Sequence, residues 1–285
     1  MKPEKMRSIG VLWSGDHLFE GTVETLEMLR SKGKQVVFVT NNSTKSRADY
    51  KKKLESMGIP ASEDEVFGSS YSAAIYISRI LSLPPTQKTV FVLGESGIET
   101  ELDSESIPHI GGTDPAYNRI IEPSDYTSIA SGQALDPSVG VVLAGLDFHL
   151  NYLKLAYAFA YLQRGAKFFA TNMDTTLPSA GSLFPGGGAI SAPLTAMMGG
   201  EKPMAFGKPS QAMMDAIEGK FKFDRKKACM VGDRLDTDIR FGIEGGLGGT
   251  LCVLTGVTKS EKEWEGEGKE VVPTAWVKQL GDLRG

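Results

Sequence analysis

Short apolar runs alternate with amphipathic stretches along most of this chain. Val23, Leu26 and Leu29 recur at helical spacing, whereas the run QVVFVT is β-branched and aromatic, as in a strand buried on both faces. The first block is predicted to begin with a helix over 20–32 that ends at Gly33, followed by a strand over 35–40. A second helix is predicted to be capped by Ser43 or Thr44 and to end near Met57. A strand over 66–68 and a helix over 70–81 complete the block.

The alternation returns in two further blocks after a proline-containing linker over 82–86. The second block is predicted to hold strands over 89–94, 139–145 and 167–171, a helix over 152–164 and irregular loops over 108–137. An exposed loop is predicted over 259–270, after the strands and helices of the third block. The third block is predicted to hold strands over 204–207, 228–232 and 250–254 and helices over 210–221 and 236–244. This order predicts an α/β fold: a doubly wound parallel-sheet (Rossmann-like) core over 1–82 and 200–285, interrupted by an inserted α/β domain over 83–199.

Composition narrows the classes of function. The 285 residues are 41% hydrophobic and 23% charged, which suits a globular protein with a sizeable core. The net charge of −4 gives no reason to expect a nucleic-acid partner, and no apolar run approaches the roughly 20 residues of a membrane helix. Cys229 and Cys252 both fall in predicted buried strands, so we expect reduced core thiols and a cytoplasmic protein.

Polar residues that could carry chemistry follow three of the predicted core strands, at the strand ends where open parallel sheets bind ligands. The first group is Thr40-Asn41-Asn42-Ser43, whose hydroxyls and amides precede a helix N-terminus and suit an anion such as phosphate. The same residues would also suit an ordinary helix cap with turn asparagines, and the segment alone does not separate the two interpretations.

The second group is Gly207-Lys208-Pro209. A lysine at a strand end can neutralise a bound phosphate, although a surface lysine before a turn is the commoner case. The third group places Asp233 after a hydrophobic strand and Asp236 and Asp238 shortly afterwards. Clustered carboxylates repel one another unless a cation shares the site, and Mg²⁺ fits this donor set best, with helix capping as the alternative.

Taken together and in this order, the three groups resemble a known family. VTNNSTKSR, GKPSQ and MVGDRLDTDI are similar to motifs II, III and IV of the haloacid-dehalogenase phosphatases. GVLWSGD, AGLD, ATNMDTTLP and FPGGGA extend the resemblance from about Gly10 to the C-terminus and point to the 4-nitrophenylphosphatase and phosphoglycolate phosphatase branch. In that branch the insert between motifs II and III is a C2-type cap over the active site.

The resemblance implies a role for each matching residue. Phosphate binding would fall to Thr40, Asn41, Asn42 and Lys208, of which Asn41 and Lys208 would be catalytic. Mg²⁺ would be held by Asp233 and supported by Asp238, and the cap loop that approaches the substrate would contribute Asn172 and Asp174. The substrate would be a small phosphorylated metabolite such as 2-phosphoglycolate, with 4-nitrophenyl phosphate as an artificial substrate, and a homodimer would form through the cap.

The N-terminal segment departs from the family pattern. Motif I is Asp-x-Asp-Gly, whose first Asp attacks phosphorus and whose second is the general acid and base. Anchored on GVLW, these two positions hold Arg7 and Ile9, which can do neither. Arg7 is expected either to pair with Asp233 or Asp238 and displace the metal, or to fray into solvent. We also expect Lys5–Trp13 to pair as a shortened strand of the core sheet.

Two functional hypotheses follow. The first is Mg²⁺-dependent phosphomonoester hydrolysis by family, with an alternative or misassigned start in place of motif I and a chain that is inactive or severely impaired. The abrupt change from MKPEKMRSI to the well-matched GVLWSGD favours it. The second is a pseudophosphatase that binds a phosphorylated ligand or partner without turnover.

Overall fold

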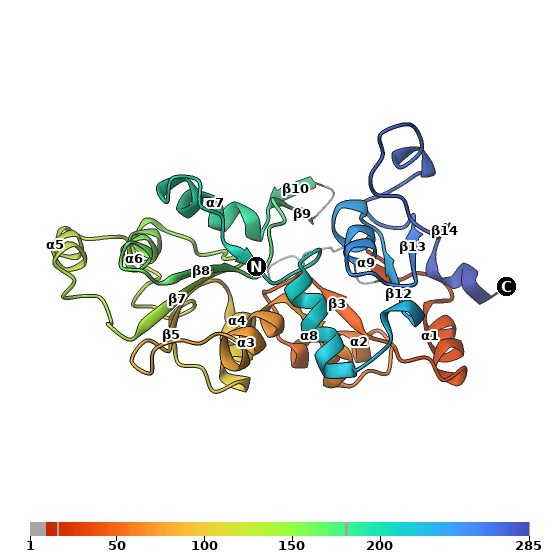
Figure 1. Cartoon of the computed structure of the whole chain (residues 1–285), viewed down its shortest axis with the longest axis horizontal. Coiled ribbons are helices and arrows are strands. Elements are labelled where there is room, and N and C mark those ends of the chain that lie inside the picture. Colours follow the sequence, from red (N-terminus) through yellow and green to blue (C-terminus); the bar gives the residue numbers. More distant parts are fainter. Residues whose placement is uncertain (1–9, 16, 180–181, 285) are drawn as a thin grey trace.

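Two lobes lie side by side in the computed structural model, which describes residues 10–15, 17–179 and 182–284 (Figure 1). The lobe built around β5 to β8 corresponds to the inserted domain, and we call it the cap lobe. The lobe that contains β3, β4 and β12 to β14 corresponds to the core, and we call it the core lobe.

The cap lobe is built on one parallel sheet of five strands in the order β11-β8-β7-β5-β6. Its strands are β5 (Thr89–Leu93), β6 (His109–Gly111), β7 (Val139–Ala144), β8 (Lys167–Ala170) and β11 (Met204–Ala205). Side chains alternate between the two faces: Val90 and Val92 join one apolar cluster, whereas Phe91 and Leu93 join another. Both faces are therefore covered, and the α/β class with a parallel sheet is confirmed.

Helices cover both faces of this sheet. On the side of Phe91 lie α5 (Pro123–Ser131), α6 (Tyr152–Gln163) and α7 (Gly187–Met197). On the side of Val90 lie α3 (Ser69–Arg79) and α4 (Ser96–Ser104). The prediction of irregular loops over 108–137 was wrong, because β6 and α5 fall within that range. α5 begins with a proline and ends at Gly132, which has the left-handed conformation. The loop-forming residue types of this stretch led to the wrong prediction.

The core strands form separate groups among the described residues. β3 (Phe38–Thr40) pairs in parallel with β4 (Val66–Gly68), and β12 (Cys229–Gly232), β13 (Gly249–Val253) and β14 (Ala275–Val277) form a second parallel sheet. Of these strands, β14 was not predicted. Cys229 is exposed and only Cys252 is buried, so the prediction that both thiols are buried was wrong for Cys229.

The segment from Gly10 to Trp13 lies at the junction of these two groups. Val11 and Leu12 pack in the same apolar cluster as Phe38 of β3 and Val231 of β12. The expected strand over 5–13 falls partly outside the described residues. Within them it is not found over 10–12, because the backbone is used locally: the Gly10 N–H donates to the Trp13 carbonyl, and the Leu12 carbonyl accepts from Phe19. The first strands among the described residues are β1 (Trp13–Ser14) and β2 (His17–Leu18), which pair antiparallel.

Helix α3 belongs to both lobes. Ala73, Ala74 and Ile77 pack against the cap sheet, whereas Tyr71 and Ile75 pack with Met213 and Phe241 of the core lobe. A helix that is apolar on two faces must be buried between two layers. The lobes are therefore joined by a shared helix as well as by the chain crossings.

The other helices of the core lobe are α1 (Thr22–Ser31), α2 (Arg47–Ser56), α8 (Gln211–Phe221) and α9 (Arg240–Glu244). Single helical turns complete it at Glu63–Glu65, Arg225–Lys227, Leu235–Ile239, Glu261–Glu263 and Leu280–Arg284. Ser46, rather than Ser43 or Thr44, caps α2 in a reciprocal capping box with Asp49. None of the helices described is long and apolar enough to cross a bilayer.

Strand pairing bears on how the lobes divide. β11, which was assigned by sequence to the resumed core, pairs with Phe169 and Ala170 of β8 at the edge of the cap sheet. The division at 82/83 and 199/200 stays a prediction. A hairpin of β9 (Thr176–Ser179) and β10 (Ser182–Pro185) rises from the cap lobe beside the junction (Figure 1).

Candidate active site

The residues that the three motifs predicted converge where the lobes meet. Thr40 ends β3, Asn172 follows β8, Lys208 follows β11 and Asp233 follows β12. All four strands present their carboxyl ends to this junction, which is the edge at which open parallel sheets bind ligands. The structure therefore brings residues from four distant parts of the chain into one network of contacts.

The turn after β3 is held by its own polar side chains. The Thr40 hydroxyl accepts the Asn42 N–H at 3.2 Å, and the Asn42 Oδ1 accepts the N–H and the hydroxyl of Thr44, both at 2.8 Å. Tyr50 on α2 brings its hydroxyl to 3.2 Å from the Thr40 hydroxyl, and burial raises the pKa of this phenol. Sequence reasoning missed Tyr50, because only the fold places α2 beneath this turn.

Asn41 makes three side-chain hydrogen bonds in the site. Its Oδ1 accepts the Lys208 N–H at 2.7 Å, and its Nδ2 donates to the Lys208 carbonyl at 3.0 Å and to Asp174 Oδ2 at 3.1 Å. Its backbone carbonyl accepts from Asn172 Nδ2 at 2.8 Å and from Ser69 Oγ at 2.9 Å. The predicted residues of motif II, motif III and the cap loop thus meet at Asn41.

Lys208 points its ammonium group into the core lobe. Its Nζ lies 2.7 Å from Asp238 Oδ1 and donates to the Val39 carbonyl at 3.0 Å. The other oxygen of Asp238 accepts the N–H groups of Asp233 and Arg234, both at 3.1 Å. A side chain on Gly232 would collide with Asp238, so glycine at this position is required for the close approach. Asp238 therefore holds both the lysine and the turn after β12.

Asp233 is the carboxylate that best suits a cation. It is buried, and burial, followed by the nearby Asp238, raises the pKa of Asp233 to about 6. One oxygen accepts the Val257 N–H at 2.9 Å, and the other lies toward Gly10, whose ideal Cβ would sit 3.7 Å away. A buried carboxylate with a raised pKa gains from a bound cation, because the cation replaces the lost hydration.

These donors fit Mg²⁺ in part. Asp233 has an oxygen to offer, and Mg²⁺ needs only one or two carboxylates together with waters and substrate phosphate. Both oxygens of Asp238 are already engaged, so Asp238 would act on the metal indirectly. Arg7 and Ile9, the residues at the motif I positions, lie outside the described residues, and so does the expected contact of Arg7 with Asp233 or Asp238.

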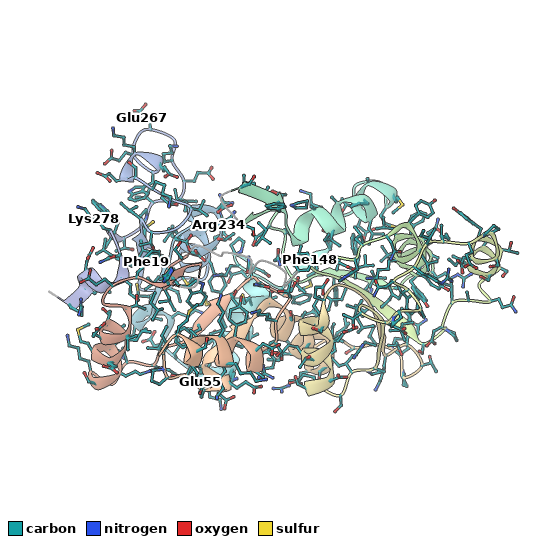
Figure 2. The ribbon with its side chains drawn as sticks, turned by 180° about the vertical axis from the view of Figure 1, so that it is seen from behind. Phe19, Glu55, Phe148, Arg234, Glu267 and Lys278 are labelled. Carbon is teal, nitrogen blue, oxygen red and sulfur yellow. The ribbon has the colours of Figure 1, made fainter. Side chains whose placement is uncertain are left out.

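Two charged side chains face each other across the junction. Arg234 lies on the side of the core lobe that faces the cap and pairs with Asp236 through both carboxylate oxygens, at 3.1 and 2.7 Å (Figure 2). In the cap loop, burial raises the pKa of Asp174, while Asn41 and then Arg234 and Lys208 act in the opposite direction. Arg234 stands inside the quoted motif IV, and the sequence offered no reason to single it out.

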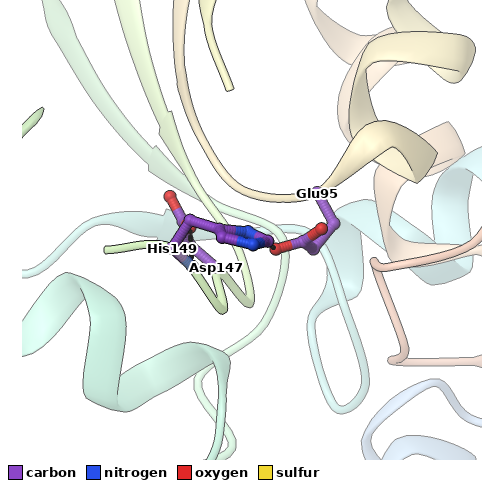
Figure 3. A group of neighbouring side chains, drawn as sticks. All are labelled: Glu95, Asp147 and His149. Atoms are coloured by element: carbon purple, nitrogen blue, oxygen red, sulfur yellow. Dashed lines mark hydrogen bonds and ion pairs between the residues drawn. The ribbon is translucent and has the colours of Figure 1, made fainter. Parts of the chain in front are cut away.

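A second polar cluster in the cap lobe consists of Glu95, Asp147 and His149 (Figure 3). Its two carboxylates both have partners within the protein. Asp147 forms a buried ion pair with Lys154 at 2.8 Å, and Glu95 accepts the Phe148 N–H at 2.8 Å and faces His149 at 3.3 Å. This cluster fastens the loop after β7 to the loop after β5.

Comparisons with known proteins bear on the identity of this site. A profile of haloacid dehalogenase-like hydrolases matches residues 8–107, and a HAD-hydrolase-like profile matches residues 205–283. The chain is 50% identical to the 4-nitrophenylphosphatase of Schizosaccharomyces pombe over 275 residues, which cover 96% of this chain and 90% of that protein. The chain belongs to the haloacid dehalogenase-like hydrolases.

Two further relatives of this haloacid dehalogenase-like chain are also phosphatases by name. Phosphoglycolate phosphatase 1A of Arabidopsis thaliana is 42% identical, with 96% of this chain and 74% of the relative covered. The crystal structure of a glycerol phosphate phosphatase from Mycobacterium tuberculosis in complex with magnesium superposes with a TM-score of 0.77 at 28% identity, covering 96% of this chain and 73% of that chain. The resemblance drawn from the motifs is confirmed, and the chain is a phosphatase by family.

Proposed function

We propose that the junction between the lobes is a site for Mg²⁺-dependent hydrolysis of small phosphomonoesters, of the 2-phosphoglycolate type, with 4-nitrophenyl phosphate as an artificial substrate. The observation that carries this proposal is the single network that joins Asn41, Lys208, Asp238 and Asp233, with Thr40 next to Asn41 at the end of β3. The magnesium complex of a related phosphatase supports the choice of cation.

Two groups of the network suit a phosphoryl group directly. The Lys208 ammonium would neutralise phosphoryl oxygens, and the Thr40 hydroxyl would donate to one of them. Mg²⁺, when bound at Asp233, would offset the negative charge shared by the carboxylates and the phosphate. The cap loop at Asn172 and Asp174 would cover the substrate and exclude water.

The same proposal holds that this chain, as written, is severely impaired. Arg7 and Ile9 stand where the family has its nucleophile and its general acid, and neither side chain can attack phosphorus or move a proton at neutral pH. Removing a covalent nucleophile costs on the order of 10⁶ in kcat in other hydrolases. Unaided hydrolysis of phosphate monoesters is too slow for water to substitute.

The test is hydrolysis of 4-nitrophenyl phosphate with and without Mg²⁺ by the unaltered chain and by Arg7→Asp/Ile9→Asp. We expect the unaltered chain to be silent and the double variant to gain Mg²⁺-dependent turnover. Arg7→Asn/Ile9→Asn is the matched control, because asparagine has a similar shape and no nucleophilic carboxylate. Normal turnover by the unaltered chain that Lys208→Ala abolishes would show that another residue attacks phosphorus.

A second candidate function is binding without turnover. It is favoured by the arrangement of the candidate phosphate site in a chain that lacks the family nucleophile. Lys208 pairs with Asp238, and Asp233 accepts the Val257 N–H. Titration calorimetry of the unaltered chain with inorganic phosphate and Mg²⁺ tests this second candidate. Saturable binding by a chain that does not hydrolyse 4-nitrophenyl phosphate supports a pseudophosphatase, whereas the absence of binding would contradict this hypothesis.

Partner and compartment stay predictions from the sequence. We expect a small phosphorylated metabolite as the ligand, no nucleic-acid or membrane partner, a homodimer through the cap and a cytoplasmic protein.

A further inference from the structure

We propose that Asn41 is a positioning residue, whose side chain aligns Lys208 and anchors the cap loop over the site without contacting the phosphoryl group. This inference deepens the proposed function and rests on it for its catalytic consequence. It departs from the role that the family resemblance implies for Asn41, which is direct contact with phosphate. Three observations carry it: the hydrogen-bond inventory of the amide, its contacts with Lys208, and its contacts with the cap loop.

The amide has no donor left for an anion. An asparagine side chain offers two N–H donors on Nδ2 and an acceptor at Oδ1. Both donors are used, one by the Lys208 carbonyl at 3.0 Å and the other by Asp174 Oδ2 at 3.1 Å. The orientation of the amide is set by its partners, because the Lys208 N–H can only donate and must face Oδ1. The remaining lone pair on Oδ1 would repel phosphate.

The contacts with Lys208 act like a clamp. Asn41 binds both the N–H and the C=O of this one residue, at 2.7 and 3.0 Å. The preceding Gly207 permits the approach, since a Cβ there would lie 2.6 Å from Asn41 Oδ1. The end of β3 thereby sets the backbone position of Lys208, and its ammonium group reaches the Val39 carbonyl and Asp238.

The contacts with the cap loop join the two lobes at the same residue. Asn41 donates to Asp174, and its carbonyl accepts from Asn172, whose own Oδ1 accepts the Asp174 N–H at 3.1 Å. The loop that covers the site is thus attached to the residue that aligns the lysine. A shift of the cap loop and a shift of Lys208 are coupled through one amide group.

A pair of swapped side chains tests the inference. Asn41→Asp keeps the acceptor for the Lys208 N–H, loses both donors and places a carboxylate against Asp174. Asn41→Asp/Asp174→Asn restores a donor and acceptor between the two residues without restoring the bond to the Lys208 carbonyl. Asn41→Leu removes every side-chain bond. Asn151→Asp, which adds the same charge at the N-cap of α6 and lies outside motifs II to IV, is the matched control.

Amide hydrogen exchange reads the structural part without any ligand. We expect Asn41→Leu to raise the exchange rates of the Lys208 and Asp174 amides at least about tenfold. Asn41→Asp should raise only the exchange rate of the Asp174 amide, and the double variant Asn41→Asp/Asp174→Asn should return the rate at position 174 to its original value. Unchanged rates for both amides in Asn41→Leu would overturn the inference, even if the chain proved not to bind phosphate at all.

Kinetics read the catalytic part in the Arg7→Asp/Ile9→Asp background. A positioning role predicts that Asn41→Asp lowers kcat for 4-nitrophenyl phosphate more than it raises KM, and that the swap recovers part of the loss. Direct contact with phosphate predicts the opposite: weaker binding of inorganic phosphate that the swap cannot rescue, because a carboxylate still faces the anion. That second result would overturn the inference and leave the proposed function standing.

Discussion

The two lobes use different means to hold their strands. In the cap lobe, β5 and β7 are buried on both faces along their whole length, and five strands form one continuous sheet. In the part of the core lobe that the structure describes, β3–β4 and β12–β13–β14 are separate sheets, and β3 is only half buried. Side chains of the site connect these sheets. The Lys208 ammonium group, for example, contacts both the Val39 carbonyl in β3 and the Asp238 carboxylate after β12.

The difference separates stability from chemistry. A buried apolar sheet gains free energy from every methylene that it removes from water. A site that must admit phosphate and a cation has to keep polar atoms at its strand ends, and these contribute little net stability. We therefore expect the cap lobe to carry more of the folding free energy and the core lobe to carry the sensitivity to ligand. Three predictions test this contrast, from the largest effect to the smallest.

The largest difference is expected between Lys154, which is fully buried, and Lys208, which is partly buried. Lys154→Met leaves the fully buried carboxylate of Asp147 without its counterion, which typically costs about 3–5 kcal/mol of the free energy of unfolding. Lys208→Met leaves Asp238 with two backbone N–H donors, so we expect a loss of about 1 kcal/mol together with the loss of phosphate binding. Urea unfolding and phosphate calorimetry measure the two effects.

The control for this pair is Lys154→Met/Asp147→Asn, which removes both charges and should recover much of the stability. Equal destabilisation by the two single lysine variants would contradict the contrast between the lobes.

A matched pair of valines tests packing directly. Val142 lies fully buried in β7, whereas Val39 lies half-buried in β3. Each Val→Ala change removes two methyl groups, so we expect about 2 kcal/mol at Val142 and about 1 kcal/mol at Val39. The comparison needs only urea unfolding of the two variants side by side. A larger loss at Val39 would mean that the core strands are better packed than their burial indicates.

The smallest effect concerns the pH dependence of the core lobe. Because burial raises the pKa of Asp233 to about 6, the folded state holds a proton that the unfolded state releases nearer pH 4. The stability of the metal-free protein should therefore fall as pH rises from about 4 through 6. Asp233→Asn should flatten this slope and remove the stabilisation by added Mg²⁺. A stability that rises over the same pH range would refute the assignment.

Much of the fold followed from local patterns. The boundaries of β4 and the positions of β5, β7 and α6 were predicted to within a residue or two, because each is strongly apolar or strongly amphipathic. The misses have physical reasons. α4 and α7 contain glycine and small residues, β14 is short and mostly exposed, and α5 lies in a stretch rich in Pro, Asp and Ser. Such segments become regular only when a neighbouring element packs against them.

The sequence by itself determined the alternation of strands and helices, the strand-end positions of Thr40, Lys208 and Asp233, and the family, since these depend on residue types in a fixed order. Only the tertiary structure decided that α3 is shared by both lobes and that β11 joins the cap sheet. It also decided that Ser43 lies buried against Leu146 instead of capping α2. The support that Tyr50 and Asn41 give to the site likewise depends on the tertiary structure. These facts depend on contacts between residues that are distant along the chain. A side chain's local sequence cannot reveal which partner will satisfy its hydrogen bonds, because that partner is chosen by how the layers pack.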